Sequence, residues 1–365
     1  MEQSYFEVLR PGINSTFQDK GRFGVQYMGL APGGAMDYQS FLLSNVLLNN
    51  EKNTGTIEFA YQGPLLKLVK GKTKIAITGN VFFKIYSKKE EINGEPYRTY
   101  DLNEGDQLDI LATKASVYGY LSIEGGFKLD KFCGSVSSQP RAFIGPNNGK
   151  KIELKDKILI SRNSTIKENK ILRNIKFEEK KIFSVLPGPQ FHYFSMDSKK
   201  QFFSTPYLIT KQTDRMGMRV IGKSLENLVN SNIPSEGIIK GAIQVPGDGN
   251  PIILLSDHPT TGGYPKVGSI ISSDYDDLVQ QNSNKEIYFQ LVTLEAAEQQ
   301  FALYIEKIKR KIAYHNPDKP NSLPNLYGLN PISTTSLKAI EASIKIALAS
   351  SNLPFLFNSI ALGFE

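Results

Sequence analysis

Residues 235–274 read SEGIIKGAIQVPGDGNPIILLSDHPTTGGYPKVGSIISSD, a stretch in which apolar segments alternate with polar and glycine-rich ones. At its centre the unbroken apolar run Ile252–Leu255 precedes a short loop, DHPTTGGYP, at Asp257–Pro265. Such a run is typical of a buried strand, and loops at strand ends often carry binding and catalytic groups. This loop brings together a carboxylate, an imidazole, two threonine hydroxyls and two adjacent glycines, so we expect the functional site here.

Short apolar runs separated by turn residues also fill the chain from Phe6 to about Leu172. Four of them are KTKIAITG (Lys72–Gly79), FFKIYS (Phe82–Ser87), DQLDILAT (Asp106–Thr113) and VYGYLSIEGG (Val117–Gly126). This spacing predicts an all-β barrel or sandwich. Residues 163–181 are polar, charge-dense and free of glycine, which suits a linker or an exposed strand. We therefore place a domain boundary near residue 175.

A few helices are expected among these strands. Asp37 is a plausible N-cap for a helix whose apolar positions are Tyr38, Phe41, Leu42 and Val46. A short helix is predicted over Asp274–Val279, and a strand over Ile287–Leu294. Two amphipathic stripes then predict longer helices. They comprise Leu294, Ala297, Phe301, Tyr304, Ile305, Ile308 and Ile312, and then Leu337, Ile340, Ile344, Ala347 and Leu348.

The composition of the chain argues against several classes of function. A chain of 365 residues favours two domains. The net charge of +7 comes from scattered lysines without a basic stripe interleaved with aromatics, so no nucleic-acid partner is expected. The single cysteine, Cys133, excludes an internal disulfide and a cysteine-based zinc site, and the three histidines lie far apart. Neither a signal peptide nor a membrane span is indicated, so we expect a cytoplasmic protein.

Three clusters combine glycine with carboxylates. They are Gln18–Asp19 with Gly21 and Arg22, then Gly33–Gly34 through Asp37, and then Glu236, Gln244, Asp248, Asp257 and Thr260–Tyr264. Adjacent glycines can form an N–H nest for an anion, and a carboxylate can act as a base or hold a metal. The same residue types are ordinary in β-turns, and the neighbouring Asp214 and Arg215 fit a structural pair as well as a ligand contact. No Walker loop, GxGxxG helix start or GxSxG elbow is present.

Five separated motifs carry a resemblance to a known family. They are TFQDKGRFG (Thr16–Gly24), PGGAMD (Pro32–Asp37), VLPGPQFHYF (Val185–Phe194), QTDRMGMRVIG (Gln212–Gly222) and the stretch 235–274. In this order, over roughly residues 6–305, they resemble the biotin-dependent carboxyltransferase family, also called the allophanate hydrolase subunit 2 family. Within it they are most similar to the members that form the C subunit of 5-oxoprolinase. The resemblance implies a mainly β fold with two related cyclophilin-like β-barrel domains and a few helices. We expect these domains at residues 1–175 and 176–310, and a helical C-terminal extension at 311–365 that goes beyond the usual end of the family.

The resemblance also implies a function. The chain would be one component of an ATP-dependent 5-oxoprolinase, a hydrolase that opens 5-oxo-L-proline to L-glutamate. It would act together with partners like the B and A subunits of that enzyme. ATP would be bound by this chain or shared with a partner, and Mg²⁺ is a candidate cofactor beside it. Two alternatives stay open: the carboxyltransferase component of a biotin-dependent urea or amide carboxylase, and a non-enzymatic regulator that binds a kinase-inhibitor-like partner. A homo-oligomer is a further candidate, with the extension as an oligomer or partner interface.

The family motifs assign roles residue by residue. The catalytic candidates are Asp257, Asp214, Arg215 and Glu236. The candidates for binding substrate or phosphate are Gln18, Asp19, Gly33, Gly34, Gln244, Thr260, Thr261, Gly262, Gly263 and Tyr264. Asp257 is expected to be a base or metal contact, Arg215 an anion clamp, and the backbone of residues 260–263 an anion cradle. His192 and His258 are expected to do no more than support these groups, and no set of protein metal ligands is predicted.

Overall fold

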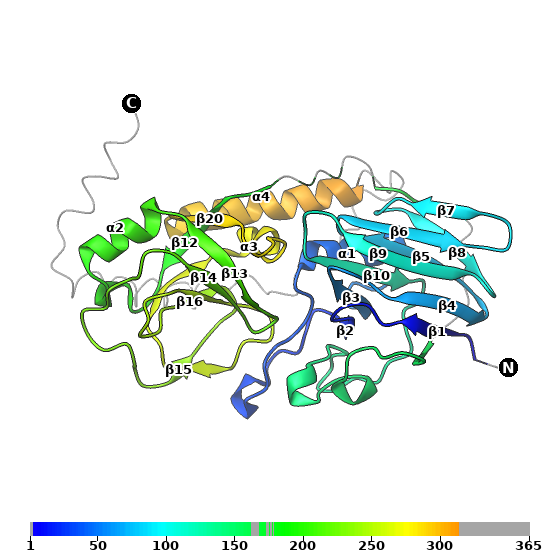
Figure 1. Ribbon diagram of the computed structural model, residues 1–365, viewed down its shortest axis with the longest axis horizontal. Coiled ribbons are helices and arrows are strands. Elements are labelled where there is room, and N and C mark those ends of the chain that lie inside the picture. Colours follow the sequence, from blue (N-terminus) through cyan, green and yellow to red (C-terminus); the bar gives the residue numbers. More distant parts are fainter. Residues whose placement is uncertain (1–2, 162–167, 173–174, 176, 178, 314–365) are drawn as a thin grey trace.

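The computed structural model describes residues 3–161, 168–172, 175, 177 and 179–313, and it confirms the expectation of a mainly β fold. Two β-rich halves lie side by side, and helix α4 (Leu294–Ala313) runs across both of them (Figure 1). The second amphipathic stripe, Leu337 to Leu348, lies outside the described residues. So does all of the expected extension beyond residue 313.

The first half is a sandwich of two antiparallel sheets. The six-stranded sheet has the order β11 (Lys157–Leu159), β1 (Tyr5–Arg10), β4 (Leu65–Lys70), β9 (Gln107–Thr113), β6 (Val81–Tyr86) and β7 (Glu91–Gly94). The five-stranded sheet has the order β2 (Thr16–Gln18), β3 (Thr56–Ala60), β10 (Tyr118–Ile123), β5 (Lys72–Thr78) and β8 (Thr99–Asn103). One apolar core draws on strands of both sheets, with Phe6, Leu66, Ile75 and Leu121 among its buried members. The four apolar runs singled out in the sequence correspond to β5, β6, β9 and β10.

The second half contains a closed barrel. Its strands follow the order β12 (Ile182–Pro187), β19 (Lys266–Ile270), β16 (Ala242–Gln244), β17 (Ile252–Leu254), β14 (Gly217–Ile221), β13 (Tyr207–Thr213) and β20 (Glu286–Leu291). The pair β12–β20 is parallel, and it closes the barrel. Helices α2 (Met196–Ser204) and α3 (Ser272–Val279) accompany the barrel, and α3 fits the short helix expected at Asp274–Val279.

The last strand ends earlier than predicted, at Leu291 instead of Leu294. Helix α4 begins at Leu294 because the Thr293 hydroxyl accepts a hydrogen bond from the Ala296 N–H at 3.3 Å. A threonine in this position caps a helix and satisfies one of its first free N–H groups.

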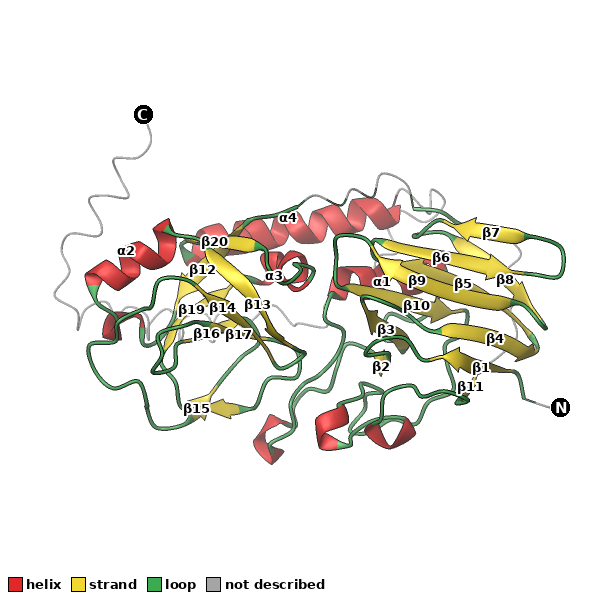
Figure 2. Cartoon of the chain, viewed as in Figure 1, coloured by secondary structure: helices red, strands yellow, loops and turns green. Residues whose placement is uncertain are grey.

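Strand alternation decides which side chains fill the barrel and which lie on its outside. Ile243, Ile253 and Val267 belong to the barrel core. Their neighbours along the strands therefore point the other way, and Ala242 and Leu254 form a separate apolar cluster there with Ile238. This outer face is covered by a two-stranded ribbon, β15 (Glu236–Gly237) paired with β18 (Thr261–Gly262), which we call the flap. Figure 2 shows β15 at the lower end of the second half.

The two halves interlock around helix α1 (Tyr38–Leu47). Asp37 caps α1 as predicted, accepting a hydrogen bond from the Ser40 N–H at 2.9 Å. Asp276 of α3 reaches the same helix start from the other half and accepts from the N–H groups of Tyr38 and Gln39, at 3.1 and 2.9 Å. Helix starts have free N–H groups and a partial positive charge, so both carboxylates are well placed. A single apolar core also spans the junction, since it includes residues of both halves.

Candidate active-site cleft

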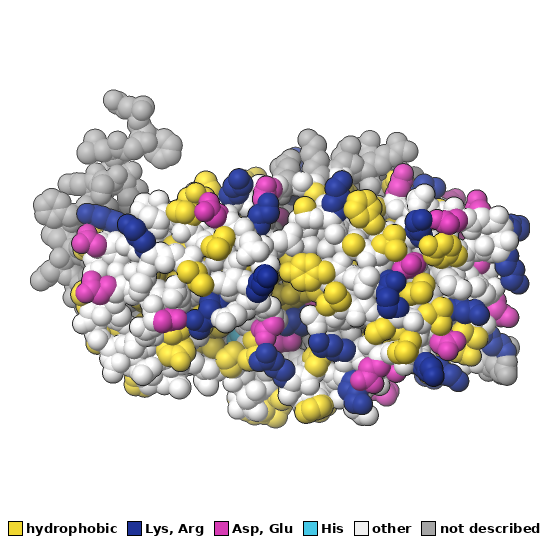
Figure 3. All heavy atoms as spheres, viewed as in Figure 1, with side chains coloured by type: hydrophobic (Ala, Val, Ile, Leu, Met, Phe, Trp, Pro, Cys, Tyr) yellow, Lys and Arg dark blue, Asp and Glu magenta, His cyan; other side chains and the backbone are white. Residues whose placement is uncertain are grey.

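A cleft of about 740 Å³ lies where the two halves meet. Its apolar wall includes Tyr61, Val117 and Tyr118 from the first half and Met216, Met218 and Leu255 from the second. Figure 3 shows hydrophobic side chains exposed between the halves, with acidic and basic side chains next to one another at their border. Pockets with an apolar wall and a few converging polar groups are the usual form of a small-molecule site.

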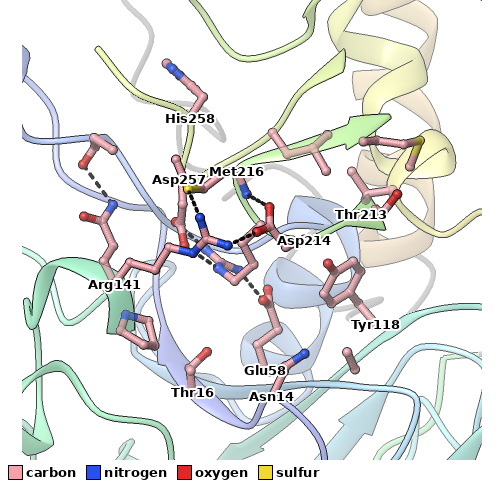
Figure 4. Close-up of a pocket in the computed structure, with 18 of the residues that line it drawn as sticks. Asn14, Thr16, Glu58, Tyr118, Arg141, Thr213, Asp214, Met216, Asp257 and His258 are labelled. Atoms are coloured by element: carbon pink, nitrogen blue, oxygen red, sulfur yellow. Dashed lines mark hydrogen bonds and ion pairs between the residues drawn. The ribbon is translucent and has the colours of Figure 1, made fainter. Parts of the chain in front are cut away.

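Arg215 is the centre of the polar groups in this cleft. It lies in the tight turn between β13 and β14, and its guanidinium donates to both carboxylate oxygens of Asp257, at 2.8 and 2.9 Å. It also donates to the Gly34 carbonyl at 2.6 Å and forms an ion pair with Glu58. Figure 4 labels Glu58 and Asp257 among the residues that line the pocket. Arg215 therefore joins β3 and the 32–37 loop of the first half to the Asp257 loop of the second.

Glu58 is held in place from several directions. Its side chain is 1% exposed, and it accepts hydrogen bonds from the Met36 N–H at 2.7 Å and the Tyr120 hydroxyl at 2.8 Å. Burial raises the pKa of Glu58, and the neighbouring Arg215 opposes this shift. Burial by itself would lower the pKa of Arg215, but the two carboxylates outweigh it and raise that pKa further. Arg215 thus stays charged and is shared between two acidic groups.

The hydrogen bonds that Arg215 already makes limit its expected role as an anion clamp. A guanidinium has five N–H hydrogens. The bonds to Asp257, Gly34 and Glu58 use four of them, so a single donor is left for a ligand. Asp257 is 12% exposed and has further acceptor capacity, so the centre suits a ligand that carries an N–H and a carbonyl group.

Asp214 lies at the rim of the cleft. It accepts from the backbone N–H groups of Met216 and Gly217, at 2.8 and 3.2 Å, and so shapes the turn that holds Arg215. Its other oxygen accepts from Arg141, an exposed residue of the first half, at 2.7 Å. This pair therefore spans the mouth of the cleft (Figure 4). Two further cations, Lys151 and Lys211, also line the cleft.

Asp19 lies beneath the cleft wall and is fully buried. It accepts hydrogen bonds from the Gly21 N–H at 2.8 Å, the Ser135 hydroxyl at 2.6 Å and the Val136 N–H at 2.9 Å. The structure thus places Asp19 as a support for the loops around it, outside the cleft lining.

Gln18 and the glycine pair form a second supporting layer. The Ser137 hydroxyl donates to Gln18 at 2.6 Å and accepts from the Gly34 N–H at 2.8 Å, while the Gly33 N–H donates to the Ser256 carbonyl at 3.1 Å. Both glycine N–H groups are therefore occupied and do not form a free anion nest. Gly34 has φ of +90°, and a Cβ there would lie 2.7 Å from the Lys20 carbonyl. Only glycine lets this loop present its carbonyl to Arg215.

The remaining predicted residues lie at the flap, away from the cleft. Thr261 and Gly262 form β18, which pairs with Glu236 and Gly237. The Thr260 and Gly263 carbonyls accept from the N–H groups of Ile238 and Ile233, at 3.2 and 2.9 Å. This segment is therefore a strand and its two ends, and it is not a cradle that faces the cleft. Within the Asp257–Pro265 loop, Asp257, His258 and Pro259 line the cleft, whereas Thr260–Tyr264 do not. Glu236 and Gln244 do not line it either.

His258 lines the cleft but is nearly buried, and one ring nitrogen lies 2.6 Å from the Pro259 carbonyl. Burial lowers the pKa of His258, so the ring is neutral near pH 7. His192 lies in a short helical turn, Phe191–Tyr193, outside the cleft lining.

Glu58, Tyr118 and Arg141 are cleft residues that the motifs did not identify. Glu58 had a signal in the sequence, since it is a carboxylate in the middle of the apolar strand TIEFA. A buried carboxylate requires a charged or hydrogen-bonding partner. Among the described residues, no group of three or more His, Cys, Asp or Glu side chains could hold a metal ion. No described helix is long and apolar enough to cross a bilayer.

Comparisons with known proteins agree with this architecture. The family model described as "Carboxyltransferase domain, subdomain A and B" matches residues 28–291. The chain is 29% identical to the C subunit of 5-oxoprolinase from Haemophilus influenzae over 85% of this chain and 99% of that one, and 27% identical to the Escherichia coli protein of the same name over 80% and 92%. The urea carboxylase structure from Kluyveromyces lactis matches 85% of this chain and 29% of its own, with a TM-score of 0.76 at 24% identity, which shows a shared fold. Because the family match spans both halves and the cleft between them, the chain belongs to the carboxyltransferase domain family.

Proposed function

We propose that this chain is one component of an ATP-dependent 5-oxoprolinase complex that opens 5-oxo-L-proline to L-glutamate in the cytoplasm. Two relatives that are named as the C subunit of 5-oxoprolinase match almost their whole length to this chain, which supports the proposal. The observation that carries it is the Arg215–Asp257 centre at the floor of the interdomain cleft. A C subunit implies further subunits, and proteins like the A and B subunits of that enzyme are the partners we propose.

The centre suits the lactam group of 5-oxoproline. The remaining N–H of Arg215 would donate to the lactam carbonyl oxygen, and Asp257 would accept from the lactam N–H or from the attacking water. A fixed donor aimed at the oxygen that gains charge stabilises the transition state of such a hydrolysis. Water attacks the carbonyl carbon, the ring C–N bond breaks, and the nitrogen takes up a proton to become the amine of glutamate. Glu58 contacts neither reacting atom in this scheme, and it positions Arg215.

The Arg215 centre is not suited to a nucleotide triphosphate. The N–H groups of Gly33 and Gly34 are already bonded, and Arg215 is flanked by two carboxylates. We therefore propose that the partner subunits bind the nucleotide, with any Mg²⁺. The cations at the rim, Arg141, Lys151 and Lys211, would then face the substrate carboxylate or the partner.

The test is glutamate formation from 5-oxoproline by the chain mixed with its candidate partner subunits and ATP. Asp257→Asn should reduce the rate by about 100-fold or more, because it removes the acceptor and weakens the fixed pair with Arg215. Asp248→Asn is the matched control, since Asp248 is an exposed carboxylate of the same half that pairs with Arg219 at the surface. Full activity of the Asp257 variant would contradict the assignment.

The same assay separates the alternatives. A rate that requires bicarbonate and a biotin carrier would indicate that the chain is the carboxyltransferase component of a urea or amide carboxylase. Tight binding to a partner of the B type, with no product under either condition, would favour a regulator.

A further inference from the structure

Arg141 reaches across the mouth of the cleft from the first half to the second. It lies in the short helical turn Pro140–Ala142 and lines the cleft. Its Nη2 atom donates to Oδ2 of Asp214 at 2.7 Å, and its Nη1 atom lies 3.0 Å from the sulfur of Met216 (Figure 4). These two residues flank Arg215 in the sequence, so the Arg141 guanidinium lies next to the turn that carries Arg215.

The turn that carries Arg141 is fixed to the wall of the cleft. The Gln139 N–H donates to the Ile144 carbonyl at 2.8 Å, which closes the turn. The Gln139 side chain donates to the Ala31 carbonyl at 3.1 Å, which ties the turn to the segment before Gly33. The first half therefore sets the position of the Arg141 backbone, while the side chain is 75% exposed at the mouth of the cleft.

Arg141 has donor capacity to spare, unlike Arg215. A guanidinium has five N–H hydrogens, and the contacts of Arg141 with Asp214 and Met216 use two of them. Three are left for a ligand once its contacts with the described residues are counted. The planar fork of a guanidinium matches the two oxygens of a carboxylate, whereas the ammonium groups of the two lysines in the cleft lining are point charges. Arg141 is therefore the cation of this cleft that best suits a carboxylate ligand.

The segment that carries Asp257 runs beside the same turn. The N–H groups of Leu255 and Asp257 donate to the carbonyls of Met216 and Arg215, at 3.0 and 2.8 Å. In 5-oxoproline the carboxylate is attached to the ring carbon next to the lactam nitrogen. A lactam N–H that donates to Asp257 therefore brings the substrate carboxylate towards that side chain, where like charges repel. A cation beside this turn offsets the repulsion, and Arg141 is held there.

We propose that Arg141 binds the carboxylate of the substrate and makes the cleft selective for lactams with an acid group next to the ring nitrogen. This inference rests on the proposed function, and it adds the residue that distinguishes 5-oxoproline from an uncharged lactam. Asp214 is then a positioning residue. One of its oxygens holds the Arg141 guanidinium, while the other accepts from the backbone of its own turn.

A binding titration of the full chain alone, followed by ligand-observed NMR, tests this contact without ATP or partners. The probes are 5-oxo-L-proline and 5-oxo-L-prolinamide, which has the same ring but a neutral carboxamide in place of the carboxylate. We expect the wild type to bind the acid about tenfold more tightly than the amide, the effect of about one hydrogen bond between charged groups. Equal binding of the two probes by the wild type, or failure to bind either, would overturn the proposal.

Three variants test whether Arg141 causes the preference for the acid. Arg141→Met should remove it, and Arg141→Lys, which keeps the charge without the planar fork, should retain part of it. Arg219→Met is the matched control and should retain all of it, because Arg219 lies outside the cleft lining and pairs with Asp248 at the surface. Thermal melts confirm that each variant is folded. A full preference in Arg141→Met would overturn the proposal.

The kinetics of the assembled complex give a second readout. Arg141→Met should raise KM for 5-oxoproline about tenfold and leave kcat within about twofold, because the carboxylate does not react and its contact is the same before and during the reaction. If no glutamate forms while the chain alone prefers the acid, the proposed function fails and the Arg141 contact stands. Glutamate formation with an unchanged KM in Arg141→Met would overturn the Arg141 contact alone.

Asp214→Asn tests the positioning role of Asp214. It should raise KM by less than Arg141→Met does, because the guanidinium is still present but is held less firmly. The double variant should have the KM of Arg141→Met alone, since Asp214 acts through Arg141. Losses that add in the double variant would show that Asp214 acts on the substrate by itself and would overturn this role.

Discussion

At the scale of single residues, Arg215 couples the two halves through charge. It lies between Glu58 and Asp257, two carboxylates that burial would otherwise destabilise. Removing one partner of a buried ion pair leaves the other charge without compensation. The stability of the fold and the geometry of the cleft therefore depend on the same guanidinium.

We predict that Arg215→Met lowers the free energy of unfolding by about 3–5 kcal/mol, the usual cost of breaking a buried pair. Arg219→Met is the matched control, because Arg219 lies on the adjacent strand β14 and pairs with Asp248 at the surface. That change should cost less than about 1 kcal/mol. Urea denaturation followed by circular dichroism measures both, since the chain has no tryptophan. A small and equal loss in the two variants would contradict the role of Arg215.

The pKa of Asp37 predicts how the stability of the fold changes with pH. Burial, then the nearby charge of Asp276, raises the pKa of Asp37 to about 7, although bonds from Ser40 and Gln280 oppose the shift. The folded state therefore keeps a proton that the unfolded chain releases near pH 4, so stability falls as pH rises from about 4 to 7. Asp37→Asn keeps a capping side chain but cannot ionise. The stability of the wild type relative to this variant should fall across that window by more than about 1 kcal/mol and then level off, since one pKa unit corresponds to about 1.4 kcal/mol. Parallel denaturation curves at pH 4, 5.5, 7 and 8 would contradict this.

At the scale of elements, the 32–37 loop determines how β3, α1 and the cleft fit together. We predict that Gly34→Ala costs about 2–5 kcal/mol, the sum of an unfavourable φ and a clash with the Lys20 carbonyl. Gly24→Ala is the control, because Gly24 has φ of +76° but a Cβ there would meet nothing within 4 Å. The control should cost about 1–2 kcal/mol. Thermal melts of both variants measure the two losses of stability. Equal losses would mean that the close packing at Gly34 does not contribute to the stability of the fold.

Elements with a local signal were predictable from the sequence, and contacts between distant segments were not. The apolar runs of β5, β6, β9 and β10, and the Asp37 cap of α1, depend on residues close together in the chain. Helix α2 was missed although Ser195 caps it, because the helix has just nine residues and few buried positions. The contact of Arg215 with Glu58 joins residues 157 positions apart, and no sequence period encodes such a pairing. The division of residues 257–264 between cleft and flap likewise depends on β18 pairing with β15.

At the scale of the whole molecule, the two halves share one structure. Their common core includes Met36 and Phe41 from the first half and Phe183 and Tyr207 from the second. Helix α4 adds a second connection, since the buried Ile308 packs on Leu42 of α1 while Tyr304 donates to Asp276 of α3 at 2.5 Å. Because the cleft lies at this junction, its shape depends on the halves staying docked. We therefore expect the described region to unfold as one cooperative unit.

The prediction is a single calorimetric transition in the wild type, with equal calorimetric and van't Hoff enthalpies. Ile308→Ala should lower the free energy of unfolding by about 2–5 kcal/mol, the range for truncating a buried isoleucine, and should shift the same transition to lower temperature. Leu303→Ala is the control on the same helix: Leu303 is 69% exposed, so its truncation should change stability by less than about 0.5 kcal/mol. Two separate transitions in the wild type would show that the halves fold independently. The shared core would then be too weak to couple the unfolding of the two halves, and the cleft would be lost at the lower of the two transitions.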